Sequence, residues 1–175
     1  FNPEKMESIR QFVTDPKYKT GFDRNYWIWK EAEPGVPYLL SADVARGDGK
    51  DYSVFHIFDT LTMELVAEYQ GRLTPDLFSR VLFDAGREYG DCMIVVENNT
   101  VGFAVLDKLK EMQYPNIYHS IKSTHEYVDQ VTAEAASNTV AGFTTSQRTR
   151  PLIVAKLEEF VRNGLITINS PRLYN

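Results

Sequence analysis

Two short apolar runs that each end in a carboxylate constrain the fold of this chain more than any other feature. The first run, Tyr38–Ala42, leads into Asp43, and the second, Met93–Val96, leads into Glu97. Apolar runs of this length are typical of buried central strands. A strand entered through a helical crossover normally lies parallel to its partner, so the two runs should be neighbours that point the same way. Both acids are then expected at one edge of the sheet.

The residues between these two runs predict an antiparallel meander followed by the crossover helix. Ser53–Phe58 and Glu64–Gln70 both alternate between apolar and polar residues, as half-buried strands do. Thr74 and Pro75 are typical of a helix start, and Gly90 is typical of a helix end. We therefore expect an α/β fold, in which a mixed sheet of a three-strand meander plus parallel strands is flanked by helices.

The rest of the chain predicts fewer elements. Thr100 is expected to cap a second helix, and a last helix should run from about Arg150 to Arg162, with a short strand at Leu165–Ile168 after it. The polar segment Tyr118–Phe143 is expected to form a long loop or an exposed hairpin. We divide the chain into a linker or N-terminal arm, residues 1–36, and one compact domain, residues 37–175.

Composition limits the compartment and the partners. The chain begins with Phe1 and shows no signal peptide and no apolar run near the ~20 residues of a membrane helix, so we expect an excised, soluble piece. Cys92 is the only cysteine, which rules out an internal disulfide and a cysteine-based zinc site. The net charge of -5 weighs against nucleic-acid binding. Carboxylates that hold divalent ions, however, count as negative charge whose sign the bound ions reverse.

Carboxylates that converge at one place predict metal chemistry. Asp43 and Glu97 would repel each other without a cation, and Mg²⁺ or Mn²⁺ prefers such oxygen ligands. Asp51, close to the second strand, is a further candidate ligand, although an Asp after glycine-rich sequence is often only a turn residue. Two ions roughly 4 Å apart activate a water and stabilise the leaving oxygen of a phosphodiester. The reaction class we expect is phosphodiester hydrolysis.

Both acid-bearing segments resemble a known family. YLLSADVARGDGKDYSV, residues 38–54, resembles the first nuclease motif of the large terminase subunits of tailed bacteriophages, a strand ending in Asp-Val before a glycine turn, a second Asp and Tyr-Ser. VVENNTVG, residues 95–102, resembles their second motif, a strand ending in Glu-Asn before a glycine-containing helix. The order of elements agrees from about Trp29 to Asn175. The resemblance implies a ribonuclease-H-like nuclease domain of the viral DNA-packaging motor.

This resemblance implies a function for the acids. Such nucleases use three acids on divalent metal, Mg²⁺ or Mn²⁺ and in a complete site two ions, to cut concatemeric viral double-stranded DNA during genome packaging. Asp43 and Glu97 would be the first two acids, and Asp51 matches a further Asp near the site. The third acid normally follows the final strand, and this sequence ends before it. The resemblance therefore implies that the chain holds metal weakly and cuts poorly.

The resemblance also implies partners and a location. The terminase ATPase domain, the small terminase subunit and the portal protein are the expected protein partners, in the cytoplasm of the host cell and without a membrane. Double-stranded DNA would be gripped by local positive groups rather than by base-reading residues. The candidates, next to the acids, in the polar segment or around the last helix, are Arg46, Lys50, Lys122, His125, Arg148, Arg150 and Lys156.

Three other functions fit parts of the sequence. A junction resolvase or another ribonuclease-H-like nuclease would need the same acids on adjacent parallel strands, and the Asp-Tyr-Ser run favours the terminase type. A non-catalytic DNA-binding or assembly module would keep the acids for structural reasons. A structural Ca²⁺ domain is the weakest of the three, because Asp43, Asp48 and Asp51 do not have the spacing of a helix-loop-helix calcium loop.

Overall fold

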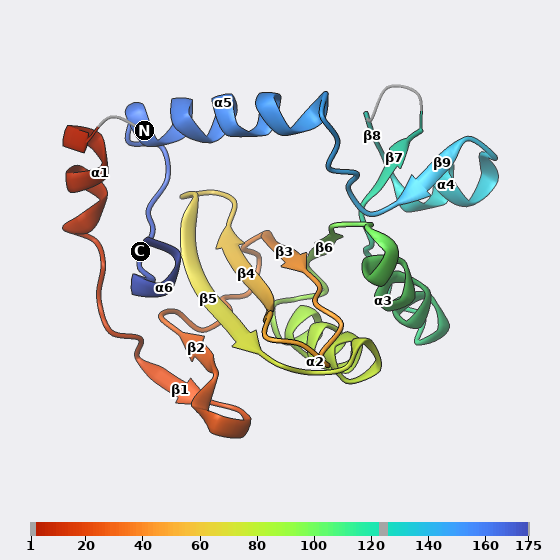
Figure 1. Cartoon of the computed structure of the whole chain (residues 1–175), viewed down its shortest axis with the longest axis horizontal. Helices are drawn as coiled ribbons and strands as arrows, with labels where there is room; N and C mark the ends of the chain where they lie inside the picture. Colours follow the sequence, from red (N-terminus) through yellow and green to blue (C-terminus); the bar gives the residue numbers. More distant parts are fainter. Residues whose placement is uncertain (1–2, 123–125, 175) are drawn as a thin grey trace.

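A computed structural model describes residues 3–122 and 126–174, and Figure 1 shows a mixed sheet with helices on both of its faces. Within the described residues, six strands form this sheet in the order β1-β2-β5-β4-β3-β6. Their bounds are β1 Tyr18–Thr20, β2 Tyr26–Ile28, β3 Tyr38–Asp43, β4 Ser53–Asp59, β5 Glu64–Gly71 and β6 Met93–Val96.

The pairing of the central strands confirms the predicted mixed sheet. β3 and β6 are parallel, with Ala42 opposite Val96 at the end of the ladder. β3, β4 and β5 form the predicted antiparallel meander. The N-terminal segment supplies β1 and β2, and β2 pairs with β5 in the same sheet. Aromatic residues of this segment pack at that edge, where Trp29 is buried and Trp27 contacts it edge to face.

The main core lies between one face of the sheet and two helices, α2 (Pro75–Glu88) and α3 (Thr100–Glu111). Alternation along the strands directs one set of side chains to this core, including the fully buried Leu40, Phe55 and Ile94. Each such side chain contributes about 1.5–3 kcal/mol by leaving water. Cys92 is also buried here, and burial raises the pKa of its thiol to about 12.

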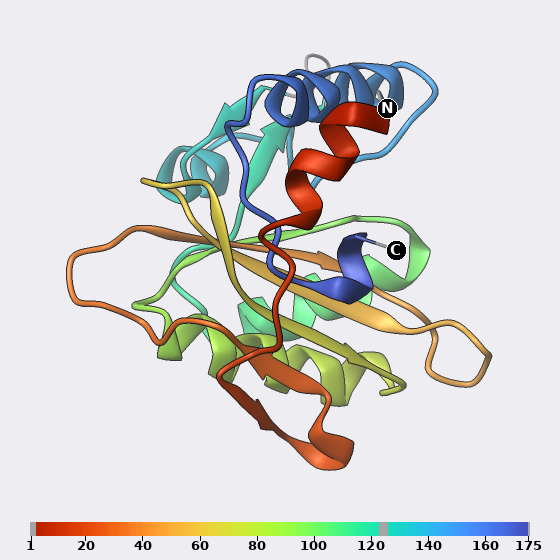
Figure 2. The same ribbon diagram turned by 90° about the vertical axis from the view of Figure 1, so that its left-hand side faces the viewer.

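The opposite face of the sheet is covered by both ends of the chain. Figure 2 shows α2 on one side of the sheet, with α1 and α5 on the other. These elements are α1 Pro3–Arg10, α5 Thr149–Arg162 and α6 Pro171–Tyr174, and a short 3-10 helix, η1 Phe22–Arg24, precedes β2. α5 confirms the predicted last helix. Only its two ends are buried, at Thr149 and Val161.

The polar segment, expected to be a long loop or an exposed hairpin, contains an antiparallel hairpin that a third strand extends into a second, smaller sheet. Its strands, in the order β8-β7-β9, are β7 His119–Ile121, β8 Tyr127–Val128 and β9 Thr139–Ala141, and helix α4 Gln130–Ala135 lies between β8 and β9. A parallel bridge between Glu97 and Phe143 joins this part to the end of β6. Strands of two or three residues are too short for a pattern of alternation, which is why the sequence did not predict them.

Two local predictions differ from the structure. The predicted strand Leu165–Ile168 is reduced to one parallel bridge between Thr167 and Glu64, because no further backbone pairs extend it. The cap of α3 is Asn99 and not Thr100, since the Asn99 side chain accepts hydrogen bonds from the backbone N–H groups of Val101 and Gly102. Across residues 3–122 and 126–174, no helix combines the length and apolarity needed to span a membrane.

Candidate metal centre

Asp43 and Glu97 meet at the ends of adjacent parallel strands. Asp43 is the last residue of β3, and Glu97 follows the last residue of β6. The Glu97 backbone N–H donates to the Ala42 carbonyl oxygen at 3.0 Å, so the parallel ladder continues to the acids. Both side chains line one cavity, and the negative charge of Glu97 helps to raise the pKa of Asp43. The predicted convergence of these two acids is therefore present.

The pKa of Asp43 is affected by the two neighbouring carboxylates, Glu97 and Asp51. Its pKa is raised above the ordinary value, first by partial burial and next by the negative charge of Glu97. The charge of Asp51 adds a smaller effect in the same direction, and a hydrogen bond from the Val44 backbone opposes it. Burial and like charge both disfavour the ionised form of an acid. A bound cation would remove this repulsion.

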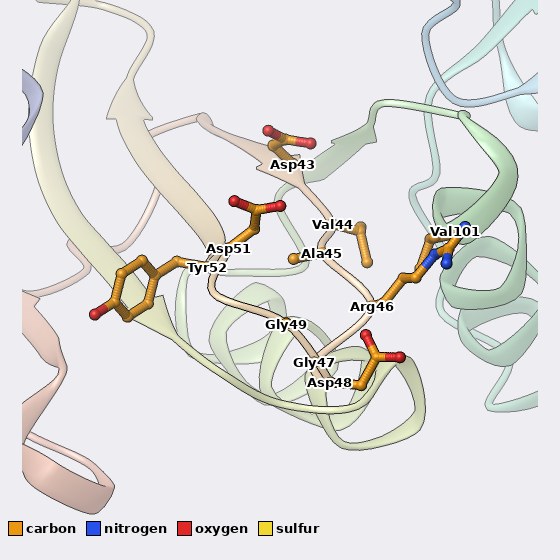
Figure 3. Close-up of a pocket in the computed structure, with 10 residues that line it drawn as sticks. All are labelled: Asp43, Val44, Ala45, Arg46, Gly47, Asp48, Gly49, Asp51, Tyr52 and Val101. Atoms are coloured by element: carbon orange, nitrogen blue, oxygen red, sulfur yellow. The ribbon is translucent and has the colours of Figure 1, made fainter.

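Asp51 lies in the loop that joins β3 to β4. Figure 3 shows its carboxylate on the side of the loop that faces Asp43, while Asp48 points away from both. The loop lines a cavity of about 340 Å³ together with Val101 at the start of α3. Gly47 allows the tight path, because a Cβ there would come within 2.4 Å of the Leu73 carbonyl oxygen.

A larger cavity, of about 580 Å³, lies on the sheet face beneath α5. Asp43 and Glu97 line it together with His56, Thr145 and Ile153. Asp43 therefore borders both cavities and is reached from two sides. Sequence analysis did not single out His56 or Thr145, although the alternation of β4 directs His56 to the side of the sheet away from the main core.

The asparagines after Glu97 hold the end of β6 in place. Asn98 is buried, and its amide donates to the Ala141 carbonyl oxygen at 2.9 Å, which fixes it to β9. Asn99 caps α3. Gly102 permits the close approach of α3 to the strand end, because a Cβ there would lie 1.9 Å from the Glu97 carbonyl oxygen. These positions explain the Asn-Asn-x-x-Gly spacing as support for the acid.

Carboxylate oxygens of Asp43 and Glu97 suit a hard divalent cation such as Mg²⁺ or Mn²⁺. The two side chains form a pair, and Asp51 is close enough to act on the charge of Asp43. Among the residues that the structure describes, no three His, Cys, Asp or Glu side chains form a cluster that could hold a metal ion. Asp43, Glu97 and Asp51 are therefore candidate ligands only.

The predicted DNA-binding residues lie on separate elements. Arg46 lines the same cavity as Asp43 and Asp51, and Lys50 is exposed in the loop that carries Asp51. The others are exposed: Lys122 after β7, and Arg148, Arg150 and Lys156 at and along α5. Lys156 also pairs with Glu159 at 3.0 Å. His125 lies outside the described residues.

The fold and the paired acids together define a class. A mixed sheet with a meander on one side, parallel strands on the other, helices on both faces and acids at the ends of the central parallel strands is the ribonuclease-H-like fold. The predicted fold class is therefore confirmed. No protein-family model matches the sequence, and no curated protein matches it either.

The solved structures that this chain resembles include terminase nuclease domains. The large terminase nuclease of thermophilic phage G20c, with bound magnesium, has a TM-score of 0.66 at 15% identity, over 96% of this chain and 75% of that one. The Thermus phage P74-26 large terminase nuclease domain has a TM-score of 0.65 at 13% identity, over 97% and 73%. The human cytomegalovirus terminase nuclease domain, manganese-soaked and inhibitor-bound, has a TM-score of 0.51 at 9% identity, over 98% of this chain and 76% of that one. The chain has the fold of these domains, as the resemblance implied.

Proposed function

We propose that this chain is a divalent-metal-dependent endonuclease domain that cuts concatemeric viral double-stranded DNA during genome packaging. The observation that supports this most is that Asp43 and Glu97, at the ends of the parallel strands β3 and β6, line one cavity within the fold of the terminase nuclease domains. Residues 37–175 would form the nuclease domain, and residues 1–36 an arm that adds strands to its sheet.

Asp43 and Glu97 would hold Mg²⁺ or Mn²⁺ through their carboxylate oxygens, and Asp51 would be a further ligand or orient a bound water. The ion supplies an activated water and charge stabilisation for the leaving oxygen of the phosphodiester. Neighbouring structures contain magnesium, cobalt or manganese, which supports a divalent cation for this fold. Arg46 and Lys50 would neutralise the phosphates on either side of the bond that is cut.

The remaining basic residues would guide the duplex towards the site. Lys122, Arg148, Arg150 and Lys156 belong to the small sheet and to α5, and His125 would join them. In a packaging motor the domain would act with the terminase ATPase domain, the small terminase subunit and the portal protein, in the cytoplasm of the host cell. Asp43 and Glu97 would be two acids where the nucleases that this chain resembles use three, so we expect weak metal binding and slow cutting by this chain.

Nicking of supercoiled plasmid in Mn²⁺ tests the proposal. The chain should nick slowly, EDTA should stop it, and Asp43→Asn should lower the rate by at least about a hundredfold, because a direct metal ligand is lost. Asp48→Asn is the matched control, since Asp48 is exposed in the same loop and points away from Asp43.

Three results would count against this proposal. Nicking that is equal in Asp43→Asn and in the unchanged chain would show that the activity does not depend on this site. Absence of nicking in every divalent metal would favour a non-catalytic DNA-binding or assembly module with the same fold. Preferential cutting of four-way junctions would instead identify a resolvase-type nuclease that uses the same acids.

A further inference from the structure

A third cavity, of about 630 Å³, is lined by none of the candidate metal ligands. It lies beside the loop that joins β3 to β4 and carries Asp51, which we call the acid loop. The cavity is formed by the segment around η1, the C-terminal end of β5, the residues that follow β5, and α6. The lining residues used in the argument are Phe22, Asn25, Tyr52, Tyr69, Arg72 and Arg172. A volume in this range accommodates a small organic ligand.

The mouth of the cavity combines exposed rings with an unneutralised positive charge. Phe22 is 85% exposed and Tyr52 is 44% exposed, so both rings are accessible to a ligand. The Arg72 guanidinium lies over the Tyr52 ring at 4.5 Å and donates to the Lys50 carbonyl oxygen at 3.1 Å. Within the described residues, Arg72 has no carboxylate at ion-pair distance. Its charge is therefore available to an anionic ligand.

The floor of the cavity is polar and depends on two glycines. The Asn25 amide nitrogen and the Tyr69 hydroxyl oxygen both lie next to Gly71. The Asn25 Oδ1 is buried and has no hydrogen-bond donor in the described part of the chain. A Cβ at Gly71 would lie 2.1 Å from the Tyr69 hydroxyl oxygen, and a Cβ at Gly21 would lie 2.8 Å from Asn25 Oδ1. Glycine at both positions keeps the space above the floor open, beside an acceptor that lacks a donor.

A second arginine borders the cavity but is already engaged. Arg172 of α6 lies over the Trp27 ring at 3.5 Å and pairs with the buried Glu68 at 3.4 Å. Among the described residues that line the cavity, Asp23 is the one with a carboxylate. Arg172 thus fixes the wall, while Arg72 at the mouth is the group that can meet a phosphate.

These features match one class of ligand. A nucleotide presents a flat base for the two rings, a phosphate for the guanidinium and N–H donors for an unpaired acceptor. We propose that this cavity binds one unpaired nucleotide of the DNA strand that passes the Asp43–Glu97 site. Tyr52 lines both this cavity and the cavity of the acid loop and directly follows Asp51, so a strand can reach from one to the other. The inference rests on the proposed function for its choice of DNA.

The test measures binding without cleavage. A fluorescent single-stranded oligodeoxynucleotide that contains one 5-iodouracil is titrated with the chain in EDTA, irradiated, and the crosslinked peptide is identified by mass spectrometry. We expect crosslinks at Phe22 or Tyr52. Tyr52→Ala, Phe22→Ala and Arg72→Ala should each weaken binding roughly tenfold, the effect of losing one stacking or cation contact to a base or phosphate.

Phe12→Ala is the matched control, because Phe12 is also exposed but follows α1 and does not line this cavity. It should bind as the unchanged chain does, and circular dichroism should show that all variants are folded. Unchanged affinity in the three cavity variants, or crosslinks only at other segments, would overturn the inference. Since no metal is present, this outcome is independent of the nicking result. A chain that binds the oligonucleotide here but does not nick would refute the nuclease and keep the nucleotide site.

Discussion

At the residue scale, Asp43 is the residue on which the proposed chemistry depends most. The sequence predicted its convergence with Glu97 from the position of each acid after an apolar run, because parallel strands bring their carboxyl ends together. The sequence could not show that His56 and Thr145 would share their cavity. That arrangement depends on how α5 crosses the sheet, which no local pattern encodes.

The raised pKa of Asp43 predicts how stability responds to pH in the absence of metal. The folded chain holds this proton more tightly than the unfolded chain, so the contribution is full below the ordinary pKa of 3.8 and is lost as pH rises through the raised pKa. At pH 7 in EDTA, Asp43→Asn should therefore increase the free energy of unfolding, on the order of 0.5 kcal/mol. Urea denaturation measures this change.

Metal should reverse the order of stability of the unchanged chain and Asp43→Asn. Millimolar Mn²⁺ should stabilise the unchanged chain and leave Asp43→Asn unaffected, because a ligand that binds only the folded state stabilises it. Equal effects of Mn²⁺ on both would show that the ion binds elsewhere, and a less stable Asp43→Asn in EDTA would mean that the carboxylate has a structural role.

At the element scale, the long elements could be predicted and the short ones could not. The apolar patterns are long enough to identify four elements in the sequence, β3, β6, α2 and α5. β7, β8 and β9 are two or three residues each, and their pairing brings together residues that the chain separates by α4. The start of α3 was predicted one residue late because Asn99 and Thr100 are both good caps, and only the hydrogen bonds distinguish them.

This difference gives a prediction for the start of α3. Asn99→Ala removes the acceptor for two backbone N–H groups and should lower the free energy of unfolding by about 1 kcal/mol. Thr100→Ala, the neighbouring control, should change it by less than about 0.5 kcal/mol, because alanine is the better residue inside a helix. Both values come from urea denaturation. A larger loss in Thr100→Ala than in Asn99→Ala would restore Thr100 as the cap.

At the scale of the whole molecule, a net charge of -5 must be reconciled with DNA as the proposed substrate. An acidic protein gains little from long-range attraction, so its affinity for a duplex has to come from a few local contacts and from bound metal. Arg46 and Lys50 are the positive groups of the acid loop. The domain should therefore bind duplex DNA weakly, and each of these contacts should contribute a large share of the binding free energy.

Salt dependence measures how many such contacts form. With Ca²⁺ present, Lys50→Ala should weaken duplex binding and reduce the slope of log affinity against log salt by about one, the effect of losing one phosphate contact. Lys108→Ala should leave the slope unchanged, since Lys108 on α3 is paired with Glu111 at 2.7 Å. Equal slopes in all three proteins would show that the duplex does not cross the acid loop near Lys50, and the path of the DNA would then have to run along α5 and the small sheet.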